Sequence, residues 1–251
     1  MEILEFGNKS NNKIVLIHGF QSPYQVWKEY INYYEPYFQI IVPVLDGHSQ
    51  SEKEDFVSFD KIVLELENYL INNHGNNIFC VYGMSMGGIV ACKLFENGRI
   101  NISNLILDGT PVVSYSNFLN NKMKKNYIKL SDKIRSRDKK TMDKACKSII
   151  TRDKLDYFCK VIDNMSNEVI VKYLDEVCKY QLKNDVSSYS QIYYYHGTKM
   201  NEHLSKKSAK FIKKNYSNSS IICFKGKGHC ENSLLNSKVM ISELDKILMK
   251  R

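Results

Sequence analysis

Gly83-Met84-Ser85-Met86-Gly87-Gly88 is the stretch of this sequence that decides the fold. Residues 77–82 before it form an apolar run typical of a strand, and residues 86–95 after it are small and apolar, as in a closely packed helix. A GxSxG pattern between a strand and a helix indicates a sharp turn, because small glycines let the helix approach the strand. In such a turn the Ser85 hydroxyl stands at the carboxyl edge of a sheet, in front of a helix N-terminus. The sequence therefore predicts Ser85 as a nucleophile.

A serine hydroxyl is a weak nucleophile until a base removes its proton, so a histidine partner is expected. His229 is the best placed of the six histidines, because it follows the last strand-like segment in a loop that contains two glycines. It also follows Ser85 in the chain, as the order Ser…acid…His requires. His203 is a poorer candidate at the start of a charged helix. The remaining candidates, interpreted as loop or strand-end residues, are His48, His74 and His196.

Outside the turn, short strand-like and helix-like segments alternate along the chain. This alternation implies βαβ units, and hence a mainly parallel sheet with helices on both faces. The predicted fold class is therefore α/β. The expected strands cover residues 14–17, 39–45, 77–82, 102–107, 191–195 and 220–224, and the expected helices cover residues 24–37, 59–72, 86–95, 204–214 and 234–249.

The alternation stops between residues 112 and 187. This segment is rich in lysine and poor in glycine and proline, and it has apolar residues at helical spacing, such as Val169, Tyr173 and Val177. We expect a helical cap here, inserted into a single α/β core made of residues 1–111 and 188–251.

Composition limits the class of protein. The chain has 251 residues, of which 43% are hydrophobic and 25% charged, as in ordinary globular domains. Its apolar runs are too short to span a bilayer, and residues 1–12 lack the apolar core of a signal peptide, so a cytoplasmic location is expected. Seven cysteines without a CxxC pair argue against disulfides and against a zinc site. Neither a metal nor an organic cofactor is expected.

The net charge of +9 is concentrated in the predicted cap. Residues 116–183 hold 17 Lys and Arg against nine Asp and Glu. A solvated helical surface is the simpler interpretation; the alternative is attraction of acidic substrates, acyl carriers or a membrane surface. Nucleic acid is not expected, because no binding motif accompanies the charge. The expected partner is a small acyl substrate, which could be anionic.

These motifs together resemble the α/β-hydrolase superfamily, and the resemblance spans nearly the whole chain outside the cap. His18-Gly19-Phe20 resembles the HG-x oxyanion loop of the family, and residues 22–27 are similar to the tryptophan-containing segment that often follows it. Residues 46–51 (DGHSQS) resemble a shortened D-x-x-G-H-G-x-S turn. The resemblance implies an α/β-hydrolase fold, with the backbone N–H groups of Phe20 and Met86 as the oxyanion hole.

The acid of the triad has two candidates. The family usually places an aspartate three residues after a glycine on the penultimate strand, but Met200 stands at that position. Glu202 lies two residues further along, and Asp108 ends the strand after the nucleophile, where some relatives such as haloalkane dehalogenases carry their acid. Asp108 could instead belong to a simple Asp-Gly turn and Glu202 could cap a helix. The sequence slightly favours Asp108.

A serine nucleophile with a histidine base predicts a hydrolase that cleaves a carboxylic ester or thioester through an acyl-Ser85 intermediate. A medium-length apolar acyl chain attached to an anionic group is the expected substrate. Two alternatives stay open on the same fold: an acyltransferase or lyase that excludes water, and a non-catalytic ligand-binding protein.

Overall fold

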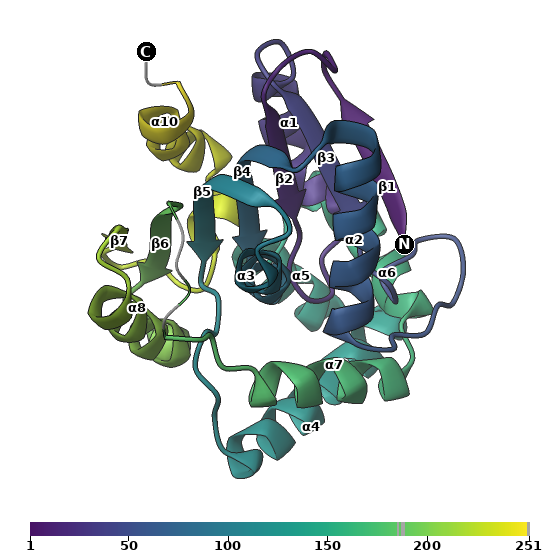
Figure 1. The fold of residues 1–251 in the computed structure, drawn as a ribbon. Helices are drawn as coiled ribbons and strands as arrows, with labels where there is room; N and C mark the ends of the chain where they lie inside the picture. The colour runs from purple at the N-terminus through teal and green to yellow at the C-terminus, as the bar shows by residue number, and fades with distance from the viewer. Residues whose placement is uncertain (185, 187–188, 250–251) are drawn as a thin grey trace.

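The computed structural model describes residues 1–184, 186 and 189–249, and its centre is one seven-stranded sheet of order β1-β3-β2-β4-β5-β6-β7 (Figure 1). Only β1 is antiparallel to its neighbour, β3, and every other pair is parallel. The sheet confirms the predicted α/β class. Its strands are β1 (Glu2–Phe6), β2 (Lys13–Ile17), β3 (Gln39–Val44), β4 (Asn77–Met84), β5 (Asn101–Asp108), β6 (Gln191–Gly197) and β7 (Ser219–Phe224).

Helices cover both faces of the sheet. One face packs against α2 (Phe59–His74), α3 (Gly87–Asn97) and α8 (His203–Asn215), and the other against α1 (Lys28–Tyr34) and α10 (Ser237–Leu248). Successive strand residues alternate between the two cores, so that Val15 and Ile17 enter one and Ile14 and Leu16 the other. Because both faces are covered, the central strands are continuous apolar runs, as the sequence suggested.

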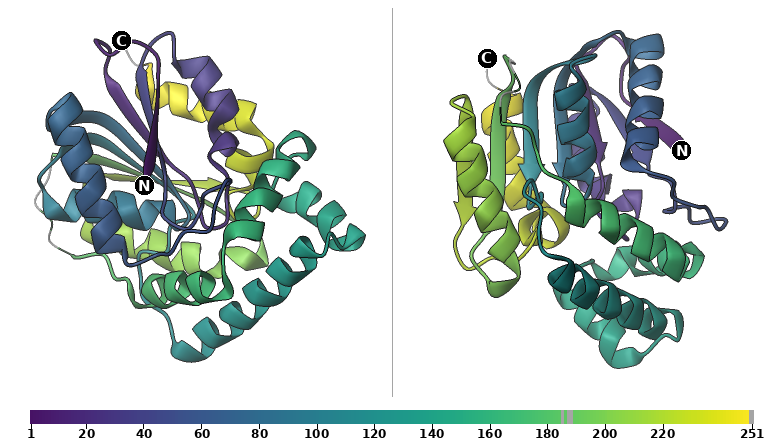
Figure 2. Two further views of the ribbon diagram at one scale, coloured as in Figure 1. Left: turned by 90° about the vertical axis from the view of Figure 1, so that its right-hand side faces the viewer. Right: turned by 60° about the horizontal axis from the view of Figure 1, so that its bottom comes forward.

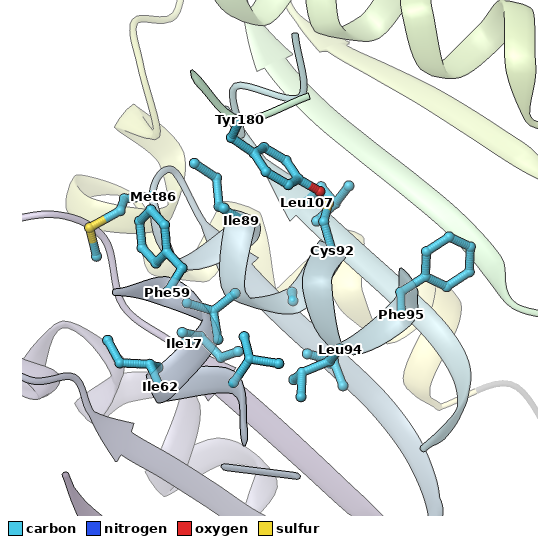
Figure 3. Close-up of a cluster of buried hydrophobic side chains, with 14 of the residues drawn as sticks. Ile17, Phe59, Ile62, Met86, Ile89, Cys92, Leu94, Phe95, Leu107 and Tyr180 are labelled. Atoms are coloured by element: carbon cyan, nitrogen blue, oxygen red, sulfur yellow. The ribbon is translucent and has the colours of Figure 1, made fainter. Parts of the chain in front are cut away.

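Part of the first core is drawn in Figure 3. Ile89 and Cys92 of α3 lie close to Phe59 of α2 and to Leu107 of β5. This tight contact holds the start of α3, and with it the turn that contains Ser85, against the sheet.

The segment where the cap is predicted forms α4 (Asn117–Arg135), α5 (Lys139–Ser148), α6 (Leu155–Asn164) and α7 (Asn167–Lys179), with the short η2 (Arg152–Lys154) before α6. Side chains of Ser116, Asp138 and Ser166 cap the N-termini of α4, α5 and α7. These helices gather at the end of the sheet where β4 and β5 finish (Figures 1 and 2). The predicted boundary between cap and core, at residues 187 and 188, lies outside the described residues.

Two elements differ from the sequence prediction. Strand β1 was not expected; it is a half-buried edge strand whose pairing with β3 joins segments far apart in sequence. The expected terminal helix is two helices, α9 (Glu231–Leu235) and α10, because the backbone of Asn236 leaves the helical region at φ −133°. In the part of the chain that the structure describes, no helix has the length and apolar character needed to cross a membrane.

Candidate active site

Ser85 lies in the sharp turn between β4 and α3. Its backbone adopts a left-handed φ of 52°, and its N–H donates to the carbonyl of Asp108 at 2.7 Å. A non-glycine residue in this region is strained, and such strain gathers at functional sites. Gly88 is required by close packing, because a Cβ atom there would lie 1.8 Å from Oγ1 of Thr110. The turn predicted from GMSMGG is therefore formed as expected.

His229 comes from the loop that follows β7 and lies beside the serine. Its Nε2 is 2.8 Å from Ser85 Oγ, the distance of a good hydrogen bond. Gly109, at φ 64°, leaves room for the imidazole, because a Cβ atom at this position would lie 2.7 Å from His229 Cε1. The rival His203 is exposed at the start of α8 and makes no comparable contact.

The acid beside His229 is Glu202. Its Oε1 lies 2.9 Å from His229 Nδ1, and its Oε2 accepts the N–H of Gly197 at 3.1 Å. Glu202 is fully buried at the end of η3 (Met200–Glu202) and its side chain does not cap α8. The row Glu202–His229–Ser85 thus joins three loops at the carboxyl edge of the sheet.

Asp108, which the sequence slightly favours, is not the residue that contacts His229. Its Oδ2 accepts hydrogen bonds from Ser233 at 2.5 Å and from Tyr82 at 3.4 Å. At the end of β5 the side chain points to the sheet face covered by α9 and α10, so that only the backbone carbonyl of Asp108 reaches the turn at Ser85. The geometry corrects the preference and leaves Glu202 as the acid of the row.

The charges of the row favour an imidazole that can accept a proton. Burial opposes protonation of His229, but the hydrogen bond and the negative charge of Glu202 outweigh burial and raise the pKa of His229. Burial alone would raise the pKa of Glu202, yet its contacts with His229 hold that pKa below its usual value. Burial raises the pKa of Asp108 to about 6, against the opposing hydrogen bond from Ser233.

The predicted oxyanion loop lies directly beside Ser85. A Cβ atom built on Gly19 would lie 3.4 Å from the Cβ of Ser85. Within residues 1–184, 186 and 189–249, neither the N–H of Phe20 nor that of Met86 donates a hydrogen bond. The role of these two N–H groups as an oxyanion hole stays a prediction.

Three residues that support this loop were not identified from the sequence. Gln21, at a left-handed φ of 58°, donates its backbone N–H to Nε2 of His48 at 3.0 Å, and its side chain to Ser131 Oγ of α4 at 2.9 Å. His48 lies in a loop, as predicted, and its side chain is fully buried there. The signal was present in the turn at residues 46–51, whose resemblance to the D-x-x-G-H-G-x-S turn includes this histidine.

A cavity of about 230 Å³ opens beside Ser85 and His229. Core residues such as Phe20 and Met86 line it, and the segment of the predicted cap contributes mostly apolar side chains. The cap residues are Tyr115, Met123, Tyr127, Leu174 and Val177. Side chains from the segment of the predicted cap therefore line the space beside Ser85.

The chain resembles known proteins strongly in structure and only weakly in sequence. No family model matches the chain. Pimeloyl-[acyl-carrier protein] methyl ester esterases from two strains of Legionella pneumophila, Corby and Paris, are 31% identical over 93 residues. That match covers 37% of this chain and only 36% of each relative.

Solved structures match over almost the whole chain. An α/β hydrolase family protein from Desulfitobacterium hafniense has a TM-score of 0.78 at 19% identity, covering 98% of this chain and 100% of that chain. A structure from a study of carboxylesterases of Nitrososphaera gargenis has a TM-score of 0.74 at 14% identity. The match covers 99% of this chain and 93% of that chain. An esterase from Exiguobacterium antarcticum has a TM-score of 0.72 at 16% identity. The match covers 96% of this chain and 92% of that chain. At these identities the likeness shows a shared fold.

Proposed function

Because this chain has the α/β-hydrolase fold, we propose that it is a serine hydrolase that cleaves a carboxylic ester or thioester through an acyl-Ser85 intermediate. The observation that carries the proposal is the hydrogen-bonded row from Glu202 through His229 to Ser85, with spacings of 2.9 and 2.8 Å, at the edge of a cavity. A ligand-binding protein has no need of this row. Each member of the row has the role that its chemistry gives it.

In the first half of the reaction Ser85 Oγ attacks the acyl carbonyl carbon while His229 Nε2 accepts the serine proton. The carbonyl oxygen becomes an oxyanion, which accepts hydrogen bonds from the N–H groups of Phe20 and Met86. Glu202 holds the Nδ1 proton of His229 and stabilises the imidazolium. His229 then gives its proton to the departing alcohol or thiol, and the acyl group stays on Ser85.

In the second half a water molecule attacks the acyl-serine. His229 Nε2 takes a proton from this water, the tetrahedral intermediate uses the same two N–H groups, and Ser85 leaves with the proton from His229. The products are a carboxylic acid and the free enzyme.

The size of the cavity favours a short acyl group. Its volume of about 230 Å³ corresponds to roughly eight groups of the size of a water molecule, at about 30 Å³ each. This supports acyl chains of about four to six carbons rather than long fatty acyl chains.

The part of the substrate outside the cavity is proposed to be an acidic carrier protein. This proposal rests on the positive charge of the surface of the cap. Five exposed lysines line two adjoining grooves on the outer side of α4 and beside α5, and none forms an ion pair with another described residue. Met123 and Tyr127, on the inner side of α4, line the cavity. The esterases of Legionella pneumophila act, by their name, on an ester attached to acyl-carrier protein. The lysines are Lys125, Lys129, Lys133, Lys140 and Lys144.

The proposal is tested by treating the purified protein and its Ser85→Ala variant with a fluorophosphonate probe and with p-nitrophenyl esters of two to twelve carbons. We expect the probe to label the wild type only, and turnover to peak at four to six carbons and to vanish in the variant. A wild type that is neither labelled nor active would contradict the proposal and favour the non-catalytic alternative. An acyl-enzyme that forms but transfers only to an added alcohol would identify an acyltransferase.

The carrier proposal is tested separately by salt. Raising ionic strength screens exposed charges, so it should lower kcat/KM for an acyl group on an acidic carrier protein but not for the free ester. Equal salt dependence for the two substrates would contradict the proposal.

A further inference from the structure

A four-residue turn holds His229 in the loop after β7. The turn runs from Gly228 to Glu231, and the backbone N–H of Glu231 donates to the carbonyl of Gly228 at 3.2 Å. In the opposite direction, the N–H of Gly228 donates to Oε2 of Glu231 at 2.9 Å. These two hydrogen bonds join the ends of the turn, on either side of His229 and Cys230.

The backbone of this turn is strained. Cys230 has a left-handed φ of 51°, in a region that favours glycine. A conformation of this kind persists only where the surrounding structure holds it. The carboxylate of Glu231 contributes to that hold, because it binds an N–H group on the other side of Cys230 in the chain. Glu231 therefore restrains the segment that carries His229.

The same carboxylate reaches the loop that carries Glu202. Oε2 of Glu231 lies 2.6 Å from the ammonium of Lys199, the residue before η3. Lys199 and Glu202 are the two ends of one turn, because the N–H of Glu202 donates to the carbonyl of Lys199 at 3.1 Å. Glu231 thus connects the turn of His229 with the turn of Glu202.

Backbone contacts bring these two loops together. The N–H groups of Thr198 and Lys199 donate to the carbonyl of Lys227 at 2.9 and 3.0 Å. A Cβ atom at Gly197 would lie 2.1 Å from the same carbonyl oxygen, so the two loops are in close contact. Lys227 also binds Oε1 of Glu231 through its ammonium at 3.1 Å, but this pair lies within one loop and does not join the two.

Glu231 is negatively charged at neutral pH. The hydrogen bond from Lys199, more than any other contact, lowers the pKa of Glu231 to about 2. The charges that raise the pKa of His229 come from Glu202 and Asp108. Glu231 is not among the described residues that line the cavity. We therefore expect it to act on the reaction through the position of His229, without contact with the substrate.

We propose that Glu231 is a positioning residue that holds His229 at hydrogen-bonding distance from Glu202. It does so by binding its own turn at Gly228 and the neighbouring loop at Lys199. This inference rests on the proposed function and adds to it a residue outside the cavity.

Steady-state kinetics on p-nitrophenyl butyrate test the proposal. Glu231→Ala removes both contacts and should lower kcat by about tenfold with KM little changed, because a small displacement of a reacting group is costly. Glu231→Gln, whose amide oxygen can still accept the N–H of Gly228, should recover part of the loss. Lys199→Met breaks the link between the loops and should lower kcat by about threefold, as befits an exposed ion pair. Lys227→Met breaks the pair within one loop and should have a smaller effect. Glu243→Gln, which removes an exposed pair on α10, is the matched control and should leave kcat unchanged.

The pH profile separates positioning from a purely structural role. In Glu231→Ala the carboxylate of Glu202 should bind His229 less firmly and raise its pKa less, so the midpoint of kcat/KM should move to lower pH. A lower melting temperature with kcat and midpoint both unchanged would overturn the inference. A loss of kcat in Lys227→Met as large as that in Lys199→Met would also overturn it, because the link between the loops would then not be the contact that matters.

A measurement without turnover separates failure of this inference from failure of the proposed function. NMR titration of the His229 imidazole, assigned by its absence in His229→Gln, reads its pKa in the wild type and in Glu231→Ala. A lower pKa in Glu231→Ala supports the positioning role even where the wild type hydrolyses no ester, and an equal pKa contradicts it.

Discussion

Glu202 and Asp108 show how much the direction of one side chain decides at the residue scale. Both carboxylates lie at the carboxyl edge of the sheet, between Ser85 and His229 in sequence. Only Glu202 meets the imidazole, whereas Asp108 is bound by Ser233 and Tyr82 on the other side of the strand end. The two residues should therefore respond differently to the loss of their charge.

Glu202→Gln should lower kcat by roughly 100- to 10,000-fold, because the amide no longer fixes the tautomer of His229 or stabilises the imidazolium. Asp108→Asn, the matched control, should change kcat by less than about tenfold, since an amide oxygen can still accept from Ser233. Steady-state kinetics on p-nitrophenyl butyrate measure both. A larger loss in Asp108→Asn, with the fold intact by circular dichroism, would move the acid role to Asp108.

The pH dependence follows from the raised pKa of His229. The base acts only when neutral, so kcat/KM should fall as the pH decreases through that pKa, with a midpoint above the ordinary 6.5. Glu202→Gln removes the group that raises the pKa and leaves burial, which lowers it, so the midpoint should move to lower pH. Asp108→Asn should move it in the same direction by less. An unchanged midpoint in Glu202→Gln would show that another group sets the profile.

At the scale of elements, the predicted oxyanion loop is held by two distant parts of the chain. His48, after β3, accepts the backbone N–H of Gln21, and Ser131 of α4 accepts its side chain. The centroid of the Phe20 ring also lies 5.2 Å from that of Tyr127 on α4 and 5.4 Å from that of Tyr173 on α7. The N–H of Phe20 is thus positioned by the core and by the cap together.

His48→Phe leaves the Gln21 N–H without an acceptor and should displace the loop. We expect kcat to fall, up to the roughly 100-fold cost of losing one oxyanion donor, with KM little changed. Ser131→Ala should have a smaller effect, and His48→Gln, which can still accept, should recover part of the loss. A variant that melts at a lower temperature but keeps its kcat would show that His48 only supports the fold.

At the scale of the whole molecule, an ion pair between a buried lysine and a partly exposed glutamate ties the cap to the core. Lys154 of η2 is 4% exposed and its ammonium lies 2.8 and 2.7 Å from the two carboxylate oxygens of Glu29 on α1. The two residues are separated by 125 positions in the chain. The pair is therefore a contact that only the folded arrangement of cap on core creates.

Glu29→Gln should lower the free energy of unfolding by about 1–3 kcal/mol, because it leaves the buried ammonium without a carboxylate partner. The matched control is Glu243→Gln, which removes an exposed pair with Lys246 on α10 and should change stability by less than about 0.5 kcal/mol. Urea denaturation measures both free energies. Equal effects would show that the tie between Glu29 and Lys154 adds nothing to stability.

The sequence by itself determined the features that depend on neighbours along the chain. The turn at Ser85, the parallel α/β alternation and the placement of His229 after the last strand were all read from local patterns, because strand, turn and helix formation are encoded within a few residues. The α/β class was confirmed on this basis. The catalytic roles of Ser85 and His229 stay predictions, which the labelling experiment addresses.

Only the tertiary structure decided the features that depend on distant segments. It selected Glu202 over Asp108, paired β1 with β3, and brought His48 and Ser131 to Gln21. It also formed a cavity beside Ser85 whose lining, among the described residues, contains no lysine or arginine. Each of these outcomes depends on where a side chain points after the sheet has twisted and the cap has packed on it. Packing of this kind arises between residues far apart in the chain, which local patterns do not encode.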